Sequence, residues 1–393
     1  MRRSTSWLFF AAALLPGIAA GAQPTTPGLE IFVFRVGQAD SMLIVGPQPQ
    51  RRSLLVDLGV SRHHPFTGTK TARHVAKRIV EITGRRHIDY FLLTHFHMDH
   101  FGNTWSGVTA FLEDGNANAT DDFTIGTVID TGALGAATVD RGSETGKFIA
   151  RLDRWQSEGR IGARTLPHFG VGQIDLGPGV SVDLVAFAGG YEAGLPSVHQ
   201  QYLQTHPGHY STRPHSENDL SIAFELSLGA FEFWTGGDLS GDDGDGTEPL
   251  SGSNYTNVET PMVARWQQTA READVEIYRA NHHGASYSTT PQLLAALDPE
   301  HVLYSAHLGH KHPSLATVER VRATARQYAT GIDRKAWGHG NRFYNRGGRI
   351  LGEIRILVAP DGATYAINGA RYRSYSDDEE RSDLDAAGGR PVE

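Results

Sequence analysis

The feature that constrains this chain most is a short apolar segment that runs directly into a cluster of histidines. Residues Ile88 to Leu93 are all apolar except Asp89 and Tyr90 and predict a buried β-strand. The sequence that follows is Thr94-His95-Phe96-His97-Met98-Asp99-His100. Because side chains alternate along an extended chain, His95 and His97 point to the same side and can bind one metal ion together. If the chain then turns, Asp99 and His100 are presented to a second ion nearby.

The absence of cysteine limits the chemistry that this cluster can perform. The 393-residue chain contains no cysteine, so thiolate zinc sites, disulfide bonds and cysteine nucleophiles are excluded. It also lacks the Gly-x-Ser-x-Gly pattern of a serine hydrolase. A metal ion must therefore be held by imidazole, carboxylate, amide or backbone oxygen. The alternative is a polar loop with surplus histidines, which four ligand-type residues within six positions disfavour.

Two later segments have the same form, a strand that ends in ligand-type residues. Phe231 to Thr235 predicts a strand, and Gly236-Gly237-Asp238 follows it. Ile277 to Arg279 leads in the same way into Asn281-His282-His283-Gly284. Each segment alone is an ordinary turn after a strand. Three such strand ends predict one site at the edge of a packed sheet.

The order of the predicted elements indicates an α/β (α+β) chain. Strands come first and a strand–helix alternation follows, in both halves, which predicts two sheets with helices outside. Residues 105–180 are less regular and predict in part an insertion between the first and later metal motifs. Ser314 to Tyr328 is predicted to be one helix, and Arg349 to Val358 one strand of a terminal hairpin.

The two ends of the chain differ from the main predicted domain, residues 23–373. Residues 1–22 resemble a signal peptide, with Arg2 and Arg3 before an apolar run and the small residues Ala20-Gly21-Ala22 at its end. The run is too short for a permanent anchor, so we expect a periplasmic or secreted protein with no membrane anchor after cleavage. Both the general and the twin-arginine export routes stay open. Residues 374–393 are acidic, then small and polar, and predict a disordered tail.

These motifs together resemble the metallo-β-lactamase superfamily. His95-x-His97-x-Asp99-His100 is similar to its signature, and Gly237-Asp238 and His282-His283-Gly284 to its later motifs. The ComEC-type competence proteins and their soluble exported relatives are the most similar group. Four further segments carry that similarity: Val36-Gly37-Gln38-Ala39-Asp40-Ser41, Leu54-Leu55-Val56-Asp57-Leu58-Gly59, Asn218-Asp219-Leu220-Ser221 and His310-Lys311-His312-Pro313.

The resemblance implies a four-layer αββα sandwich with two metal ions at the sheet edges. His95 and His97 would hold the first ion and Asp99, His100 and His282 the second, while Asp238 would bridge both. Asp99 would also accept a proton, and His312 would contact the substrate or support a ligand. Many members place a further histidine ligand before residues 218–224. His215 is the candidate here, although ComEC-like relatives often lack that ligand and a solvent-exposed loop histidine is the alternative.

The function expected from these residues is that of an exported hydrolase with two divalent metal ions. Zinc is the default metal and manganese the alternative. Hydroxide held by the metals would attack a phosphodiester or a related ester. Two alternatives stay open: a β-lactamase or lactonase, and a non-hydrolytic protein such as an iron-dependent oxidoreductase.

Charge bears on the expected partner. The net charge of −8 argues against a dedicated nucleic-acid-binding scaffold. A small molecule or a phosphodiester is therefore the expected substrate. Nucleic acid is a secondary expectation that needs a basic rim, for which Arg85, Arg86, Arg213 and Lys311 are candidates. The sequence leaves the oligomeric state open.

Overall fold

The computed structural model describes residues 26–60, 69–113, 122–132, 143–198, 200–201, 216–241, 256–271, 273–307 and 311–374. The expected signal segment, the tail from residue 375, His215 and Arg213 lie outside these ranges. Within them, no helix is long and apolar enough to cross a membrane.

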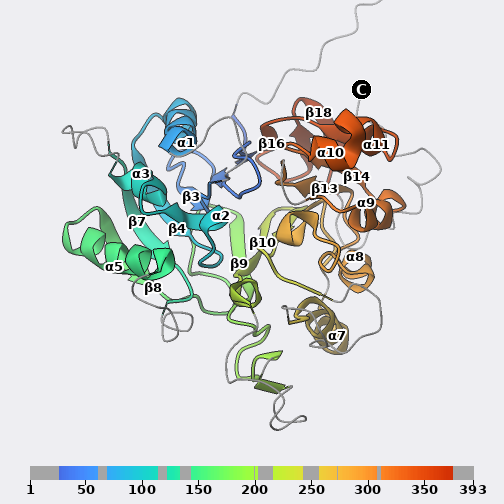
Figure 1. The fold of residues 1–393 in the computed structure, drawn as a ribbon, viewed down its shortest axis with the longest axis horizontal. Helices are drawn as coiled ribbons and strands as arrows, with labels where there is room; N and C mark the ends of the chain where they lie inside the picture. The colour runs from blue at the N-terminus through green and yellow to red at the C-terminus, as the bar shows by residue number, and fades with distance from the viewer. Residues whose placement is uncertain are drawn as a thin grey trace, which may run out of the picture.

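Two large β-sheets form the centre of the described structure (Figure 1). The first has the strand order β18-β17-β16-β1-β2-β3-β4-β7-β8. Its strands are β1 (Leu29–Val33), β2 (Met42–Val45), β3 (Ser53–Val56), β4 (His87–Leu92), β7 (Thr124–Ile129), β8 (Ile161–Thr165), β16 (Ile354–Val358), β17 (Thr364–Ile367) and β18 (Ala370–Arg373).

The second sheet has the order β15-β14-β13-β12-β11-β10-β9. Its strands are β9 (Val180–Ala186), β10 (Ala223–Leu228), β11 (Phe231–Thr235), β12 (Ile277–Arg279), β13 (His301–Tyr304), β14 (Arg326–Ala329) and β15 (Gly348–Ile350). A small hairpin, β5 (Gly102–Asn103) with β6 (Ser106–Gly107), forms a separate two-stranded sheet.

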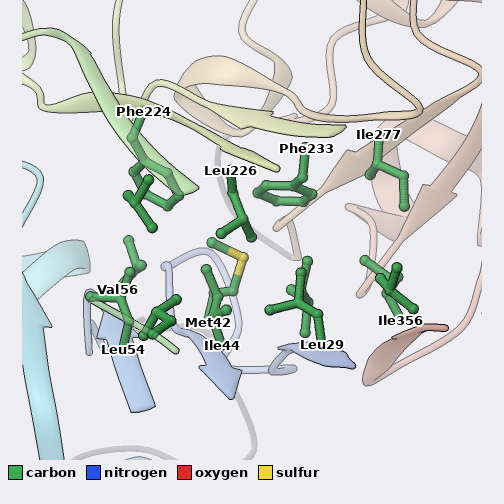
Figure 2. Packing of buried hydrophobic residues seen from close by; sticks show 14 of the residues in the cluster. Leu29, Met42, Ile44, Leu54, Val56, Phe224, Leu226, Phe233, Ile277 and Ile356 are labelled. Atoms are coloured by element: carbon green, nitrogen blue, oxygen red, sulfur yellow. The ribbon is translucent and has the colours of Figure 1, made fainter. Parts of the chain in front are cut away.

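The two sheets face each other across one apolar core. Alternate residues of β1, namely Leu29, Ile31 and Val33, belong to this core, whereas Phe32 packs on the opposite face. Figure 2 shows the same arrangement, with Leu29 and Ile44 of the first sheet packed against side chains such as Phe233 of the second. Strands buried on both faces need apolar residues at almost every position, which explains the continuous apolar runs in the sequence.

Helices cover the outer face of each sheet. α1 (Thr69–Thr83), α3 (Val108–Leu112) and α5 (Glu144–Ser157) pack on the first sheet, and α7 (Glu259–Thr269), α8 (Pro291–Leu297) and α9 (Leu315–Arg322) on the second. In α1, Val75 and Ile79 lie one turn apart and are buried, and Gly84, at φ +74°, follows the last turn. The four-layer αββα arrangement expected from the sequence is confirmed.

Residues 105–180 are more regular than their loops suggest. They supply β7 and β8, which extend the first sheet, and α5, whose Phe148, Leu152 and Trp155 are buried against it. This segment is therefore integrated into the first sheet and its outer helical layer.

Two of the predicted elements are wrong at the second sheet. The helix expected over Ser314 to Tyr328 ends at Arg322, and Arg326–Ala329 forms β14, a central parallel strand between β13 and β15. The strand expected over Arg349 to Val358 is divided at Gly352 (φ +77°): β15 belongs to the second sheet and β16 to the first. In both places, pairing with neighbouring strands outweighs the local sequence preference, which is for one long helix in the first case and for one continuous strand in the second.

The shared core yields a test of the sandwich. Leu226 is fully buried between the sheets, so we expect Leu226→Ala to lower the free energy of unfolding by about 2–5 kcal/mol through the cavity it leaves. The control is Leu315, which is 53% exposed at the start of α9. Leu315→Ala should change the free energy of unfolding by less than about 0.5 kcal/mol. Urea unfolding of the two variants measures both values. Equal, small effects of the two variants would contradict the burial of Leu226 between the sheets.

Candidate metal centre

The ligand-type residues lie where strands of both sheets end. β3 and β4 are parallel neighbours in the first sheet, and β11 and β12 in the second. Their carboxyl ends lead to Asp57, to His95 and His97, to Asp238, and to His282 and His283, respectively. One backbone hydrogen bond joins the two sheets here, from the N–H of Ile222, just before β10, to the Thr94 carbonyl. A second joins the ends of β11 and β12, from the His282 N–H to the Gly237 carbonyl, and both measure 3.0 Å. The carboxyl ends of parallel strands are the usual place for a ligand site in α/β folds.

Asp57 orients the start of the histidine cluster. Its buried carboxylate accepts hydrogen bonds from the N–H and the hydroxyl of Thr94, each at 2.8 Å. The same carboxylate lies 2.8 Å from His100 Nδ1. A carboxylate on one ring nitrogen fixes the imidazole and leaves the other nitrogen for a metal ion. His100 Nε2 accordingly points at Asp238 Oδ1, 3.2 Å away.

Asp238 is the residue on which the imidazoles converge. Besides the contact with His100, its Oδ2 lies 4.0 Å from His95 Nε2, 3.6 Å from His282 Nε2 and 3.7 Å from His283 Nε2. Its N–H donates to Ser221 Oγ at 3.0 Å. Gly237 before it has φ +55°, and a Cβ there would come within 2.8 Å of Thr94 Cβ, so only glycine lets the strand end approach this closely.

The first motif folds as its spacing predicts. His95 Nε2 and His97 Nδ1 are 3.1 Å apart, so the two rings lie on the same side of the chain. α2 (Met98–Phe101) then begins and presents Asp99 and His100. Asp99 Oδ2 is 3.5 Å from His283 Nε2, and the Asp99 side chain is 36% exposed. The four residues of the motif thus lie together with Asp238.

The histidine pair of the second sheet is held in an unusual backbone conformation. His282 and His283 have φ of +48° and +54°, a left-handed region that residues with a side chain rarely adopt. Glu259 fixes this turn: its carboxylate accepts from Asn281 Nδ2 and from the N–H groups of Thr289 and Thr290, each at 2.8 Å. Strained backbone that the surroundings hold in place is typical of functional sites.

The two histidines of that pair have different neighbours. His283 Nδ1 donates to the Ser305 carbonyl at 2.8 Å, which turns its Nε2 towards Asp99 and Asp238. The His282 ring lies 3.3 Å from Asn218 Nδ2. Both rings therefore border the centre. His283, to which the sequence analysis gave no role, lies 3.7 Å from Asp238 Oδ2, against 3.6 Å for His282, and also contacts Asp99 Oδ2 at 3.5 Å.

Asp40 and Arg279 are further members of the site that the sequence analysis did not assign. Asp40, His100, Asp238 and His283 are all buried and offer one ligand-type atom each, all within 4.8 Å of one another. Arg279 is also buried and forms an ion pair with Asp40, and burial lowers the pKa of Arg279 to about 9. The only signal in the sequence was the position of Asp40 in the segment Val36 to Ser41.

Three of the imidazoles have protonation states that suit metal binding. Burial lowers the pKa of His95 well below its usual value, and the pKa of His97 and His282 in the same direction, to about 4 for His282. These rings are therefore neutral at pH 7, with a lone pair to offer.

For Asp238, burial works to raise the pKa, but the surrounding histidines outweigh it and the pKa lies well below the usual range. Asp238 is therefore ionised. His100 differs from the three neutral imidazoles: burial works to lower its pKa, but Asp238 and Asp57 outweigh it and the pKa lies well above its usual value.

The donor set fits divalent metal ions. His100 Nε2, Asp238 Oδ1 and His283 Nε2 are buried atoms that make no hydrogen bond within the described ranges. Polar atoms buried in this way need a partner, and nitrogen and carboxylate donors pointing at one space are what zinc or manganese accepts.

The remaining candidates lie at different distances from the centre. His312 is half-buried, and its ring centroid is 5.8 Å from that of His282 and 6.2 Å from that of His283, so it lines the same site. Lys311 beside it is exposed. Arg85 and Arg86 precede β4, at the end of the strand opposite to the histidine cluster, where Arg85 pairs with Asp89. These two arginines do not form a basic rim, because the strand separates them from the centre by about 20 Å.

Comparisons with known proteins assign no family to this chain. No protein-family model and no curated protein sequence matches the chain. Among solved structures it is similar to unliganded yeast PDE1, at 10% identity and a TM-score of 0.41, over 84% of this chain and 100% of that one. It is also similar to the metallo-beta-lactamase fold protein YhfI from Bacillus subtilis, at 11% identity and a TM-score of 0.38, over 76% and 93% of the two chains.

A third similar structure is CmlA, a diiron β-hydroxylase from Streptomyces venezuelae, at 14% identity and a TM-score of 0.36. The match covers 75% of this chain and 47% of CmlA, so the chain spans about half the length of that enzyme. TM-scores and identities this low assign neither family nor function. The αββα architecture is instead evident from the strand order and the packing of this chain.

The position of Asp57 behind His100 yields a test. Asp57→Asn keeps the shape of the side chain but removes its charge, so we expect the affinity for Zn²⁺ to fall about 10- to 100-fold. Competition with a chromogenic chelator measures this affinity. Asp153→Ala, which changes an exposed carboxylate on α5, should leave it unchanged. An Asp57→Asn variant that folds and binds zinc as the parent does would show that Asp57 does not orient the ligand.

Proposed function

We propose that this chain is a two-metal hydrolase of the metallo-β-lactamase superfamily and that it cleaves phosphodiesters. The observation that carries the proposal is the position of Asp238, a buried and ionised carboxylate surrounded by imidazoles from both sheets. One carboxylate with two oxygens that reach ligands on both sides is the arrangement that bridges two cations.

Asp238 would be shared by two ions, and each ion would have its own set of further ligands. His95 and His97, whose rings are adjacent, would hold one ion. Asp99, His100 and His282 would hold the other, and His283 is positioned to join or replace His282 there because it lies close to both Asp99 and Asp238. The donors are nitrogen and oxygen only, so we propose zinc, with manganese as the alternative.

The metal ions would activate water and neutralise charge on the phosphoryl group. The residues of the chain do the rest. Asp57 and the Ser305 carbonyl fix the two imidazoles, His100 and His283, and so keep the centre organised before substrate binds. Asp99 has the most exposed carboxylate of the centre and is placed to accept a hydrogen bond from the attacking water. His312, at the side of His282 and His283, would contact the substrate.

Phosphodiesters are proposed over carboxylic esters and lactams on grounds of charge. Two cations can bind both nonbridging oxygens of a phosphodiester, whereas a carbonyl offers one oxygen and needs less neutralisation. The ComEC-like segments of the sequence support the same choice. The signal-like residues 1–22 support a place outside the cytoplasm, which we also propose.

Removing the bridging carboxylate tests the metal centre. Protein purified from cells should carry close to two divalent ions per chain, measured by plasma mass spectrometry. We expect Asp238→Ala to lose most of the metal and at least about 100-fold in rate, because this carboxylate would serve both ions. His87→Ala, at the opposite end of β4, should change neither value. Full metal content and full rate in Asp238→Ala would show that Asp238 does not bridge.

A panel of four chromogenic substrates tests the reaction class. We expect turnover of a phosphodiester with zinc or manganese, and little turnover of a phosphomonoester, a lactone or a β-lactam. Single-stranded DNA should be cleaved more weakly and less well at high salt, because the net charge of −8 opposes a polyanion. Lactone or lactam cleavage without phosphodiester cleavage would favour the β-lactamase or lactonase alternative. Tightly bound iron would favour an oxidoreductase.

A further inference from the structure

A buried amide next to the metal centre has a donor that no described residue uses. Gln38 lies in the loop between β1 and β2 and is 3% exposed. Its Oε1 accepts a hydrogen bond from the N–H of His307 at 3.1 Å. This bond fixes the orientation of the amide group, because an N–H requires the oxygen and not the nitrogen opposite it. Gln38 Nε2 is then left as a buried donor without a hydrogen bond in the described structure.

Positive charge gathers around the same place. Arg35, three residues before Gln38, is exposed, and its Nη2 lies 3.3 Å from His307 Nε2. Arg334, the first residue of α10 (Arg334–Trp337), is also exposed. Burial lowers the pKa of His307, and Arg35 and Arg334 lower it further, whereas Asp333 opposes them. His307 is therefore neutral at pH 7 and accepts from Arg35, which orients the guanidinium group.

Backbone packing holds this group of residues in place. A Cβ on Gly331 would come within 2.5 Å of His307 Cδ2, so the glycine lies directly against the imidazole. The N–H of Ala306 donates to Thr330 Oγ1 at 3.2 Å. The ring of His307, which lies in the loop after β13, thus packs against the loop after β14, and the place is built before any ligand arrives.

The group borders the metal centre on the side of His283. Ser305, two residues before His307, accepts the hydrogen bond from His283 Nδ1. Asp40, two residues after Gln38, has Oδ1 at 3.6 Å from the same nitrogen. Gln38 and His307 are thus each two residues from a group that contacts His283.

We propose that Gln38 Nε2 and the guanidinium of Arg35, oriented by His307, form a subsite for a second phosphate group of the substrate. The inference rests on the proposed phosphodiesterase function and names the substrate class: a phosphodiester that carries a further phosphate nearby. A phosphate presents several acceptor oxygens, which can take the amide N–H and the guanidinium N–H groups at once. Arg334, which is exposed and whose charge also acts on His307, adds positive charge nearby.

Two chromogenic esters separate this subsite from the metal centre. One is the p-nitrophenyl ester of thymidine 5′-phosphate, and the other is the same ester with an additional 3′-phosphate. The parent protein should have the lower KM for the second ester. Gln38→Glu keeps the acceptor for the His307 N–H but replaces the donor with a negative charge. We expect it to raise the KM of the 3′-phosphorylated ester about tenfold or more, and to leave its kcat and the KM of the simple ester within about twofold.

A charge-matched control and a direct binding measurement accompany these kinetics. Arg35→Gln should act in the same direction as Gln38→Glu. Lys77→Gln removes one positive charge from α1, where the side chain is 76% exposed, and should change neither KM. Calorimetry with inorganic phosphate on the metal-loaded protein should show weaker binding for Gln38→Glu than for the parent protein, at equal metal content.

The outcomes distinguish the subsite from the proposed function. If neither ester is hydrolysed, the phosphodiesterase proposal fails, and the calorimetry alone decides on the subsite. The subsite is overturned if Gln38→Glu leaves phosphate binding and both KM values unchanged. It is also overturned if the variant raises both KM values equally or loses metal, since Gln38 would then act through the centre itself.

Discussion

The burial of the Asp238 carboxylate is the constraint on which the rest of the site depends. An ionised carboxylate 1% exposed is costly unless positive charge compensates it. Around it lie His95 and His100 from the first sheet and His282 and His283 from the second, of which His95 and His282 are neutral at pH 7. Divalent cations would supply the missing charge and would link the two sheets at the same point. Metal binding and the stability of this edge of the sandwich are therefore expected to be coupled.

Other buried carboxylates make the geometry around Asp238 rigid. Asp57 and Glu259 accept hydrogen bonds from backbone N–H groups and side chains, and burial raises the pKa of each. Asp57 fixes His100 behind the first motif, and Glu259 fixes the left-handed turn that carries His282 and His283. The positions of the ligand-type atoms are thus set by the protein itself, which reduces the reorganisation needed when ions and substrate bind.

The chemistry of the centre could be predicted from the sequence because it is local in the chain. The alternation of His95 and His97 and the turn at Asp99 and His100 need only the geometry of a strand followed by a short helix. His283, Asp40 and Arg279 were not assigned because their roles arise from distance in space. Arg279 and Asp40 are separated by most of the chain and meet only where the loop after β1 lies against β12. The role of Gln38 could not be predicted for the same reason, because its amide is fixed by the backbone N–H of His307, which is distant in the chain.

By itself, the sequence determined that strands end in histidine and aspartate, that no thiolate can take part, and that two layered sheets are needed to bury its apolar runs. Those properties follow from local periodicity and composition, which do not depend on the tertiary fold. The tertiary structure alone decided that Arg326–Ala329 is a strand and not the end of a helix, because parallel partners on both sides satisfy its backbone. It also decided which histidines face Asp238 and which arginines stand beside the centre, since both depend on loops that meet at the edge of the sandwich.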